Sequence, residues 1–438
     1  MPTRRQFLRN SLLTGAGVSV GLNACASRRI LGANERVNIA SIGVNGRGAG
    51  LTEFFAKAQH CHIHSVCDVD TRAHAKVQQA IAEAGYARPA GEQDFRRVLD
   101  DKDIDAVVIA TPDHWHAPMA ILALDAGKDV YLEKPCSHNP AEGDMLVAKI
   151  EKTGGKVQMG NQTRSSASIA AVVDEIRQGL IGEAYAAKAW YANTRGPIGD
   201  HRKEAVPEWL DWELWQGPAP RTEFDHLYVH YHWHWFWPYG TGELLNNGTH
   251  EIDMCRWALG VDYPTKVTST GGRYHFDDAW EAYDTQTVGY EYGDGKTINW
   301  EGRSCNGMQF WNRGRGALIH GTTGSVILNR DGFVEYDLQG KEVRNVREAG
   351  KTVSMDIRGG GTLDDNHIAN FIGAIREDTP LNSPIVDANV SVTTCHLGNI
   401  AQRTGGTLTI DPTTGKPREQ DALALWGRDY ATGWEPKV

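Results

Sequence analysis

Length, composition and charge describe an ordinary globular chain and exclude some partners. The 438 residues suffice for two or three domains with a sizeable core. Hydrophobic residues make up 40% of the chain and charged residues 23%, which is typical of globular proteins. The formal net charge of −10 argues against a nucleic-acid partner, whose phosphates basic side chains would have to neutralise.

The first residues predict an export signal rather than part of the fold. The stretch "TRRQFL" (Thr3–Leu8) has the form of a twin-arginine signal, and an apolar, glycine-rich stretch follows it to about Ala24. That stretch is too short to stay in a bilayer as a spanning helix. Two endings stay open: Cys25 is a lipidated first residue that tethers the protein to a membrane, or "ACA" (Ala24–Ala26) is a cleavage site. We assign residues 1–35 to this signal and its linker, and expect a periplasmic protein.

Strands and helices alternate over the next part of the chain. Apolar strands are predicted at Arg36–Val44, His62–Asp70, Ile104–Pro112 and Lys128–Pro135, and helices at Ala117–Gly127 and Pro140–Thr153. This alternation implies a doubly wound parallel sheet with helices on both faces, as in a Rossmann domain. We assign residues 36–155 to it.

From Lys156 onward the pattern changes to short alternating strands. After a helix near Ser166–Leu180, strands are predicted at Glu183–Tyr191, Thr265–Tyr274, Asp284–Gly302, Gly316–Leu328 and Gly332–Lys341. The turns "GDGK", "TTGS" and "LQGK" indicate an antiparallel meander, and two helices near Asp365–Glu377 and Asp387–Thr404 close the chain. The predicted fold class is therefore α/β plus α+β. In it, residues 156–438 form a second domain, an open antiparallel sheet with helices on one face.

A glycine-rich loop follows the first strand. "GVNGRG" (Gly43–Gly48) matches G-x-G-x-x-G except that Asn45 replaces the middle glycine; Asn also tolerates a positive φ. Gly43 permits a tight turn, and the following helix N-terminus can receive a pyrophosphate. Asp68 ends the second strand, where a carboxylate bonds ribose hydroxyls and repels a 2′-phosphate. This predicts NAD rather than NADP, although Arg72 lies nearby. The alternative is a purely structural glycine turn.

A later stretch carries three polar residues at helical spacing. In "LLNNGTHEIDMCRWALG" (Leu244–Gly260), the residues Asn246, His250 and Asp253 are spaced i, i+4 and i+7, which places them on one helix face. An amide, an imidazole and a carboxylate in a row are unusual for either a solvated or a core face. We expect this face to line a substrate cleft, with Asp253 as a helix-face ion-pair partner left as an alternative.

These segments together resemble one enzyme family. "ATPDHWHAPMAI" (Ala110–Ile121), "YLEKP" (Tyr131–Pro135) and "GTGELLNNGTHEIDMCRWAL" (Gly240–Leu259), with the glycine loop, resemble the glucose–fructose oxidoreductase and inositol dehydrogenase family (Gfo/Idh/MocA). The resemblance extends from Arg36 to beyond Thr404. It implies an active site between the two domains, in which Lys134 and His250 act on the hydroxyl that is oxidised.

The chemistry suits these two side chains. Hydride removal from a C–H requires loss of the neighbouring O–H proton, for which a neutral imidazole is a suitable base. An ammonium can stabilise the developing alkoxide. We expect Glu133 to orient Lys134. Asn246 stands where many members carry Asp; an amide can orient a hydroxyl but cannot share a proton.

The resemblance and the motifs give a set of expected site residues. Cofactor binding is expected of Gly43, Asn45, Gly46, Arg47, Gly48, Asp68, Thr111, Pro112, His114, His116, Glu133, Lys134 and Asn161. Substrate binding is expected of Arg195, His232, Trp235, Tyr239, Asn246 and Asp253, and catalysis of Lys134, His250 and Asn246.

One aromatic stretch allows several interpretations. In "YVHYHWHWFWPYGTG" (Tyr228–Gly242), a strand would place His230, His232 and His234 on one face, a pattern that can bind zinc, but no convincing fourth ligand follows. We favour a substrate wall on which aromatic rings stack, with plain core packing as the alternative. We predict no metal site, and the seven cysteines follow no zinc or disulfide pattern.

The resulting prediction is an exported, NAD-dependent oxidoreductase, forming a homo-oligomer. Its substrate is a small molecule: a sugar, glycoside or cyclitol that is oxidised at a secondary hydroxyl. The hydroxyl at C3 of a glycoside is one candidate for the oxidised group. Because the periplasm has no nicotinamide pool, and exported relatives keep their cofactor, we expect NAD that does not dissociate. One alternative is a glycoside hydrolase that oxidises C3 transiently, although such enzymes usually lack the E-K-P lysine. Another is a non-enzymatic sugar-binding lipoprotein.

Overall fold

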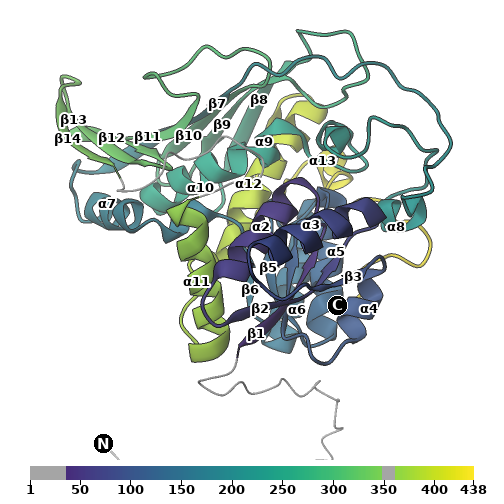
Figure 1. Cartoon of the computed structure of the whole chain (residues 1–438). Helices are drawn as coiled ribbons and strands as arrows, with labels where there is room; N and C mark the ends of the chain where they lie inside the picture. The colour runs from purple at the N-terminus through teal and green to yellow at the C-terminus, as the bar shows by residue number, and fades with distance from the viewer. Residues whose placement is uncertain (1–35, 348–360) are drawn as a thin grey trace, which may run out of the picture.

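The computed structural model describes residues 36–347 and 361–438. The predicted twin-arginine signal and Cys25 lie outside the described residues. Two sheets form the frame of the molecule, and helices lie between and around them (Figure 1).

The first sheet is parallel and has the strand order β3-β2-β1-β4-β5-β6. Its strands are β1 Val37–Ile42, β2 Cys61–Cys67, β3 Ala90–Glu92, β4 Ala106–Ile109, β5 Asp129–Leu132 and β6 Val157–Met159. Its helices are α2 Gly46–Lys57, α3 Thr71–Glu83, α4 Phe95–Asp100, α5 His116–Asp125 and α6 Pro140–Thr153. This order confirms the predicted doubly wound Rossmann sheet. The order reverses between β1 and β4, and in such sheets a ligand crevice opens at that point.

Local sequence explains these elements. Strands β4 and β5 are buried along their whole length, which is why they appear as continuous apolar runs. Helix α6 coincides with its predicted range because both ends carry strong signals. The side chain of Asn139 caps the backbone N–H of Glu142, Pro140 occupies the first turn, and Gly154 ends the helix at φ 65°.

The second sheet has nine strands in the order β14-β13-β12-β11-β7-β10-β9-β8-β15. They are β7 Ala184–Ala192, β8 Lys266–Gly272, β9 Thr285–Glu291, β10 Thr297–Arg303, β11 Arg315–Gly321, β12 Gly324–Asn329, β13 Gly332–Asp337, β14 Glu342–Arg347 and β15 Thr407–Thr409. It is mostly antiparallel, but β7 pairs with β10 in parallel. The prediction of a wholly antiparallel meander was therefore wrong at β7, which lies between β11 and β10 in the sheet. Strands β14 and β15 were not predicted.

Helices cover one face of this second sheet, as predicted (Figure 1). They are α9 Gly242–Asn246, α10 Gly248–Leu259 and α12 Ile385–Arg403. Along β9 and β10 buried and exposed residues alternate, so only one face of these strands is covered. The remaining elements are α7 Ala167–Arg177, α8 Trp212–Gln216, α11 Thr362–Glu377, α13 Gln420–Leu423 and the 3₁₀ turns η1 Asp113–Trp115, η2 Gln162–Ser165 and η3 His232–Trp235.

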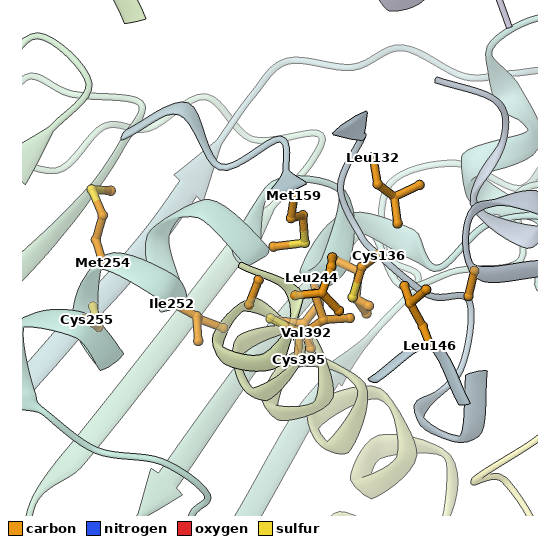
Figure 2. Packing of buried hydrophobic residues seen from close by; sticks show 14 of the residues in the cluster. Leu132, Cys136, Leu146, Met159, Leu244, Ile252, Met254, Cys255, Val392 and Cys395 are labelled. Carbon is orange, nitrogen blue, oxygen red and sulfur yellow. The ribbon is translucent and has the colours of Figure 1, made fainter. Parts of the chain in front are cut away.

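The two sheets share one core. Leu132 and Met159, from β5 and β6, belong to the same buried cluster as Leu244 and Ile252, from α9 and α10 (Figure 2). Helix α12 contributes Val392 to this cluster. The shared packing fixes the carboxyl end of β5, where Lys134 follows, relative to α10, which carries His250. Among the described residues, no helix is long and apolar enough to cross a membrane.

Candidate active site

A cleft of about 1170 Å³ lies where the two sheets meet. The glycine loop and the ends of β2 and β4 form one side of it. Lys134 and the α9–α10 segment form its centre, and residues from β7 and from the ends of β11 to β13 form the other side. Every group below is placed relative to this cleft.

The glycine loop forms a cradle for an anion. Gly43 has φ 80°, and a Cβ there would lie 2.8 Å from the backbone of Ala110. A Cβ at Gly48 would lie 1.7 Å from the carbonyl oxygen of Gly43, so both positions require glycine. Helix α2 then begins with no side-chain cap and no acidic residue in its first turn. Its first N–H groups are thus available to a ligand such as a pyrophosphate.

One detail of the loop differs from expectation. Asn45 has φ −88°, an extended conformation, and the positive φ falls on Gly46 at 41°. The tolerance of asparagine for positive φ therefore does not explain Asn45. Asn45, Gly46 and Arg47 all line the cleft, whereas Gly48 packs behind the loop.

Asp68 lies in the cleft wall at the end of β2. Its carboxylate accepts hydrogen bonds from the backbone N–H of Val44 at 2.8 Å and of Asp70 at 2.9 Å. Burial raises the pKa of Asp68, and these two hydrogen bonds oppose the rise. Arg72 forms an ion pair with Asp70 at 2.8 Å and lies over the ring of Trp209, outside the cleft wall. A fixed acid and an engaged arginine at this point suit a free ribose diol better than a 2′-phosphate.

Lys134 reaches across the domain boundary to the later helix. Its Nζ donates to the backbone oxygen of Asn246 at 2.7 Å and to its Oδ1 at 2.9 Å. Burial lowers the pKa of Lys134, and Glu133 and Asp113 oppose this. Contrary to expectation, the partners of the Glu133 carboxylate do not include the ammonium of Lys134. This carboxylate accepts from the backbone N–H of Lys134 at 3.1 Å and pairs with Arg47 at 2.8 Å.

His250 faces the same part of the cleft. Within the part of the chain that the structure describes, its imidazole has no hydrogen-bond or ion-pair partner, and it lines the cleft. Burial, followed by the charges of Arg330, Arg315 and Lys134, holds the pKa of His250 well below its usual value. The imidazole is therefore neutral near pH 7 and has a free nitrogen to accept a proton.

A buried carboxylate, Glu243, supports this centre. It accepts from Nε of Arg195 at 3.0 Å and from the hydroxyl of Ser304 at 2.8 Å, and it also binds the side-chain amide of Asn247. Although burial opposes ionisation, Arg195 and these hydrogen bonds hold the pKa of Glu243 below its usual value. Arg195 and Asn246 line the cleft as predicted. Glu243 was missed, although it stands in the quoted motif.

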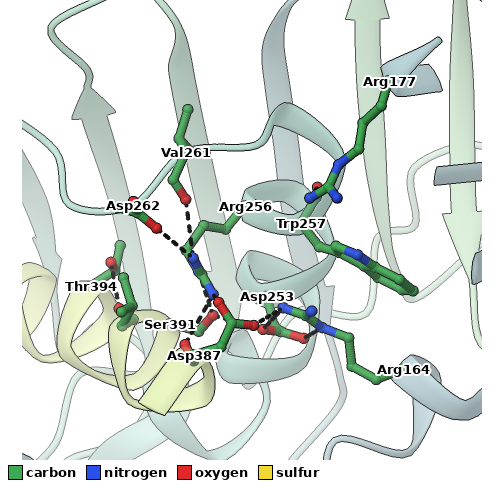
Figure 3. A network of polar contacts seen from close by, with 11 residues as sticks. Arg164, Arg177, Asp253, Arg256, Trp257, Val261, Asp262, Asp387, Ser391 and Thr394 are labelled. Carbon is green, nitrogen blue, oxygen red and sulfur yellow. Dashed lines mark hydrogen bonds and ion pairs between the residues drawn. The ribbon is translucent and has the colours of Figure 1, made fainter. Parts of the chain in front are cut away.

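Asp253 does not face the cleft, so its predicted substrate role is wrong. The helix breaks at Asn247, between α9 and α10, and the i, i+7 relation to Asn246 is lost. Asp253 instead pairs with Arg164 at 2.7 Å and accepts from Ser391 at 2.7 Å (Figure 3). Arg164 also pairs with Asp387 of α12 at 3.0 Å, so the network joins three segments of the fold. The ion-pair alternative describes Asp253 correctly.

The aromatic stretch is a 3₁₀ turn at His232–Trp235 rather than a strand. Trp235 is 1% exposed and stacks on Trp280 at 4.1 Å between ring centroids. Tyr239 is fully buried, and neither it nor His232 lines the cleft. These three predicted substrate contacts are therefore wrong. The neighbouring side chains that do line the cleft are His230, Tyr231, Trp233 and His234.

The three histidines do not converge. His230 pairs with Asp70 at 3.0 Å, whereas His234 packs on the ring of Trp233. No group of three or more His, Cys, Asp or Glu side chains in residues 36–347 and 361–438 could hold a metal ion. The zinc interpretation thus has no ligand set in this part of the chain.

The remaining predicted cofactor residues divide into two groups. Thr111, Pro112 and His116 line the cleft, and the ring nitrogens of His116 lie 2.6 and 2.8 Å from the carbonyl oxygens of Pro135 and Thr111. His114 is fully buried, with Nε2 2.9 Å from the carbonyl oxygen of Trp215, and Asn161 is 1% exposed. Neither lines the cleft, because both side chains point into the packing behind it.

Sequence analysis missed several cleft residues on the second sheet. Arg313 and Arg315 precede and begin β11, and Arg330 lies in the turn between β12 and β13. Their only sequence signal is a pair of arginine-containing turns, "NRGRG" and "LNRDG", and strand pairing is needed to bring these together.

Family models match both halves of the chain. "Oxidoreductase family, NAD-binding Rossmann fold" matches residues 37–161, and "Oxidoreductase family, C-terminal alpha/beta domain" matches residues 186–346; both are models of one family, GFO_IDH_MocA. The glycine-loop cradle and Asp68 fit NAD, the dinucleotide that the first of these two domains binds in the family.

Individual relatives cover less. A glycosyl hydrolase family 109 protein 2 from Shewanella sp. (strain ANA-3) is 34% identical over 209 residues, which is 43% of this chain and 45% of the relative. The match thus spans less than half of that protein.

Solved structures share the fold. A levoglucosan dehydrogenase in complex with NADH and levoglucosan has a TM-score of 0.65 at 18% identity, covering 86% of this chain and 99% of that chain. An aldose-aldose oxidoreductase from Caulobacter crescentus has a TM-score of 0.64 at 18% identity, covering 86% and 100%.

Proposed function

The chain belongs to the Gfo/Idh/MocA oxidoreductase family, and from this premise we propose that it oxidises a secondary hydroxyl of a sugar, glycoside or cyclitol with NAD. The observation that carries the proposal is that Lys134, His250 and the glycine loop all line one cleft. A neutral base and an ammonium at the centre of that cleft are the two groups that alcohol oxidation requires.

Cofactor binding is assigned to the first sheet. The N-terminus of α2 would hold the pyrophosphate, and Asp68 would bind the adenosine ribose. Thr111, Pro112 and the Glu133–Lys134 segment line the route from that loop to the centre of the cleft. When bound, NAD accepts the hydride from the carbon that is oxidised.

The chain's own residues would handle the proton. Lys134 donates a hydrogen bond to the substrate oxygen and stabilises its developing negative charge. His250 removes the hydroxyl proton at its free nitrogen while the carbon loses hydride and becomes a carbonyl. Asn246 positions Lys134, since two of its oxygens accept from Nζ. Arg195 and the aromatic residues Tyr231 and Trp233 form a wall that suits a sugar ring.

We extend the proposal to export and cofactor retention. A twin-arginine signal at Thr3–Leu8 carries folded proteins, so NAD can be bound before export. A retained NAD would oxidise one sugar and reduce another, with no external nicotinamide. Levoglucosan and aldoses, after which two of the structural neighbours are named, are reasonable first probes.

The test has two steps. Mass spectrometry of the small molecules released by the denatured protein should detect NAD rather than NADP. A sugar panel should then change the nicotinamide absorbance of the native protein. Protein that holds no nicotinamide and shows no absorbance change with any sugar, even with added NAD, would favour a sugar-binding protein instead.

A second candidate is an NAD-dependent glycoside hydrolase. The observation that favours it is the 34% identity to glycosyl hydrolase family 109 proteins over about 200 residues. Lys134 opposes it, because hydrolases of this fold usually lack the E-K-P lysine. Aryl glycosides separate the two candidates: release of the aglycone without any added acceptor indicates hydrolysis, and absorbance change without release indicates oxidation.

A further inference from the structure

The cleft is rich in arginine, and most of these cations are paired. Arg47 pairs with Glu133 and Asp364, and Arg195 pairs with Glu243. Arg315 binds both oxygens of Glu251, at 2.7 and 3.0 Å. Arg313 pairs with Asp331 at 3.3 Å. These four arginines therefore need no ligand to balance their charge.

Arg330 differs from them. It lies in the turn between β12 and β13, lines the cleft, and its guanidinium has no hydrogen-bond or ion-pair partner among the described residues. Glu251 and Asp364 are the carboxylates whose charges raise the pKa of Arg330, and both are already held, by Arg315 and Arg47. Burial and the charge of Arg315 lower the pKa of Arg330 to about 9. An unmatched guanidinium therefore faces the cleft.

The position of Arg330 points to the substrate rather than the cofactor phosphates. Arg330 lines the same cleft as His250 and Lys134, and its charge lowers the pKa of both. The cradle for a pyrophosphate lies instead at the N-terminus of α2, on the first-sheet side of the cleft. A group bound by Arg330 would thus sit beside the reacting carbon.

We propose that the substrate carries a carboxylate, as a sugar acid does, and that Arg330 binds this group through its two parallel N–H donors. This rests on the proposed function above and names its substrate class. The guanidinium of Arg330 carries one positive charge, which matches a carboxylate better than a doubly charged phosphate. The planar fork of arginine also fits a carboxylate at two points.

The experiment measures binding to the full, NADH-loaded protein by calorimetry. The probes are hexuronates (glucuronate, galacturonate and mannuronate), the matched neutral hexoses, glucuronamide and glucose 6-phosphate. We expect at least one hexuronate to bind about tenfold or more tightly than its neutral hexose, since charge-assisted hydrogen bonds are the strong ones. Glucuronamide should behave as the neutral sugar. Equal binding of every acid and its neutral partner, no binding of any acid, or a preference for glucose 6-phosphate would overturn the proposal.

Variants assign the effect to Arg330. Arg330→Met should abolish the preference for the acid, Arg330→Lys should retain part of it, and the neutral hexose should bind all three proteins alike. Arg303→Met is the matched control, because Arg303 pairs with Glu301 and does not line the cleft. If Arg330→Met weakens NADH binding and leaves the acid preference intact, the arginine serves the cofactor and the proposal fails.

The two proposals fail separately. Reduction of bound NAD by neutral sugars, with no acid preference, would retain the oxidoreductase and remove the carboxylate site. Arg330-dependent binding of a hexuronate with no change at the nicotinamide would retain the site and remove the oxidation. Circular dichroism of Arg330→Met and Arg330→Lys checks the fold, and the lysine variant keeps the test valid should the methionine variant unfold.

Discussion

His250 must accept a proton in surroundings that carry several positive charges. Burial together with Arg330, Arg315 and Lys134 lowers its pKa well below the usual value. A base with such a low pKa is deprotonated over a wide pH range but has a weaker pull on the proton. In the proposed reaction the ammonium of Lys134 compensates, because it would stabilise the alkoxide that the base helps to form.

Loss of either central side chain should lower turnover. We expect His250→Ala and Lys134→Ala each to reduce kcat by about 10²-fold or more, the usual scale for a positioned acid–base group. NAD retention should survive His250→Ala, because the glycine loop lies on the first sheet. Steady-state kinetics with saturating sugar, measured at several pH values, test this. A fully active His250→Ala protein would remove α10 from the mechanism.

Asn246→Asp is a finer probe of the same centre. In the unmodified protein, Nζ of Lys134 lies 2.9 Å from Oδ1 of Asn246. The new carboxylate keeps an oxygen acceptor at this position and adds a negative charge near His250. We expect activity within about tenfold of the original, since the geometry persists. The pKa of His250 should rise, so activity on the acid side should be lost at a higher pH than in the unmodified protein. An unchanged pH profile would place residue 246 outside the mechanism.

Sequence alone could identify groups whose role depends on local pattern. Gly43, Asp68 and Lys134 each follow a strand in a motif, and His250 lies on an amphipathic helix. The mistaken residues depend on backbone detail or on distant partners. A break at Asn247 turns Asp253 away, and a 3₁₀ turn buries Trp235. The unpaired state of Arg330 depends on pairings of other residues, which a single sequence does not show.

At the scale of elements, we propose that the end of β2 selects between NAD and NADP. Asp68 is fixed by two backbone N–H groups, so its carboxylate has a defined position at the cleft wall. Asp68→Ala should weaken NAD binding and reduce discrimination against NADP, because the carboxylate both binds the diol and repels a phosphate. Arg72→Ala is the control and should change neither, since Arg72 is held by Asp70. Titration of both dinucleotides measures it, and tighter NADP binding by the unmodified protein would contradict the assignment.

The network around Asp253 has a structural role that can be tested in the same way. The side chains of Arg164 and Asp253 are 9% and 3% exposed, so loss of the Asp253 charge leaves the buried Arg164 with Asp387, which is 40% exposed, as its remaining carboxylate partner. We expect Asp253→Asn to lower the free energy of unfolding by about 3 kcal/mol, as for other broken buried pairs. Asp262→Asn is the control and should cost about 0.5 kcal/mol or less, because the Asp262 side chain is 84% exposed.

Urea unfolding gives both energies, and turnover by the folded fraction gives the second readout. Asp253 does not line the cleft, so kcat should stay within a few-fold of the original. Loss of turnover at unchanged stability would return Asp253 to the active site and contradict its place in the network.

The two sheets differ in how much of their strand order could be predicted from the sequence. The first sheet followed from its alternating pattern of strands and helices, because central strands such as β4 and β5 are buried along their whole length and stand out as apolar runs. The second sheet was predicted strand by strand but not in order. Strand β7 is followed in the chain by a long stretch of helices and turns. It nevertheless pairs in parallel with β10, which comes after that stretch. Nothing in the local sequence of β7 specifies a partner more than a hundred residues away.

At the scale of the whole molecule, one core joins the two sheets around α12. Leu132 of β5 and Leu244 of α9 belong to the same buried cluster, so the domains cannot separate without exposing apolar surface (Figure 2). The cleft is thus built only when the complete chain has folded. Under the proposed export, the protein would therefore have to fold around NAD before it leaves the compartment that contains NAD.

This reasoning leads to a prediction for export. The residues concerned, Arg4 and Arg5, lie outside the described residues, and the prediction rests on the sequence "TRRQFL". Replacement of both by Lys should keep the protein in the cytoplasm, because paired guanidinium groups mark a twin-arginine signal. Cell fractionation with immunoblotting measures the distribution, and mass spectrometry measures the NAD content of each fraction. The trapped protein should hold NAD as fully as the exported one. Normal delivery of the Lys variant to the periplasm would contradict the signal, and exported protein without NAD would contradict cofactor loading before export.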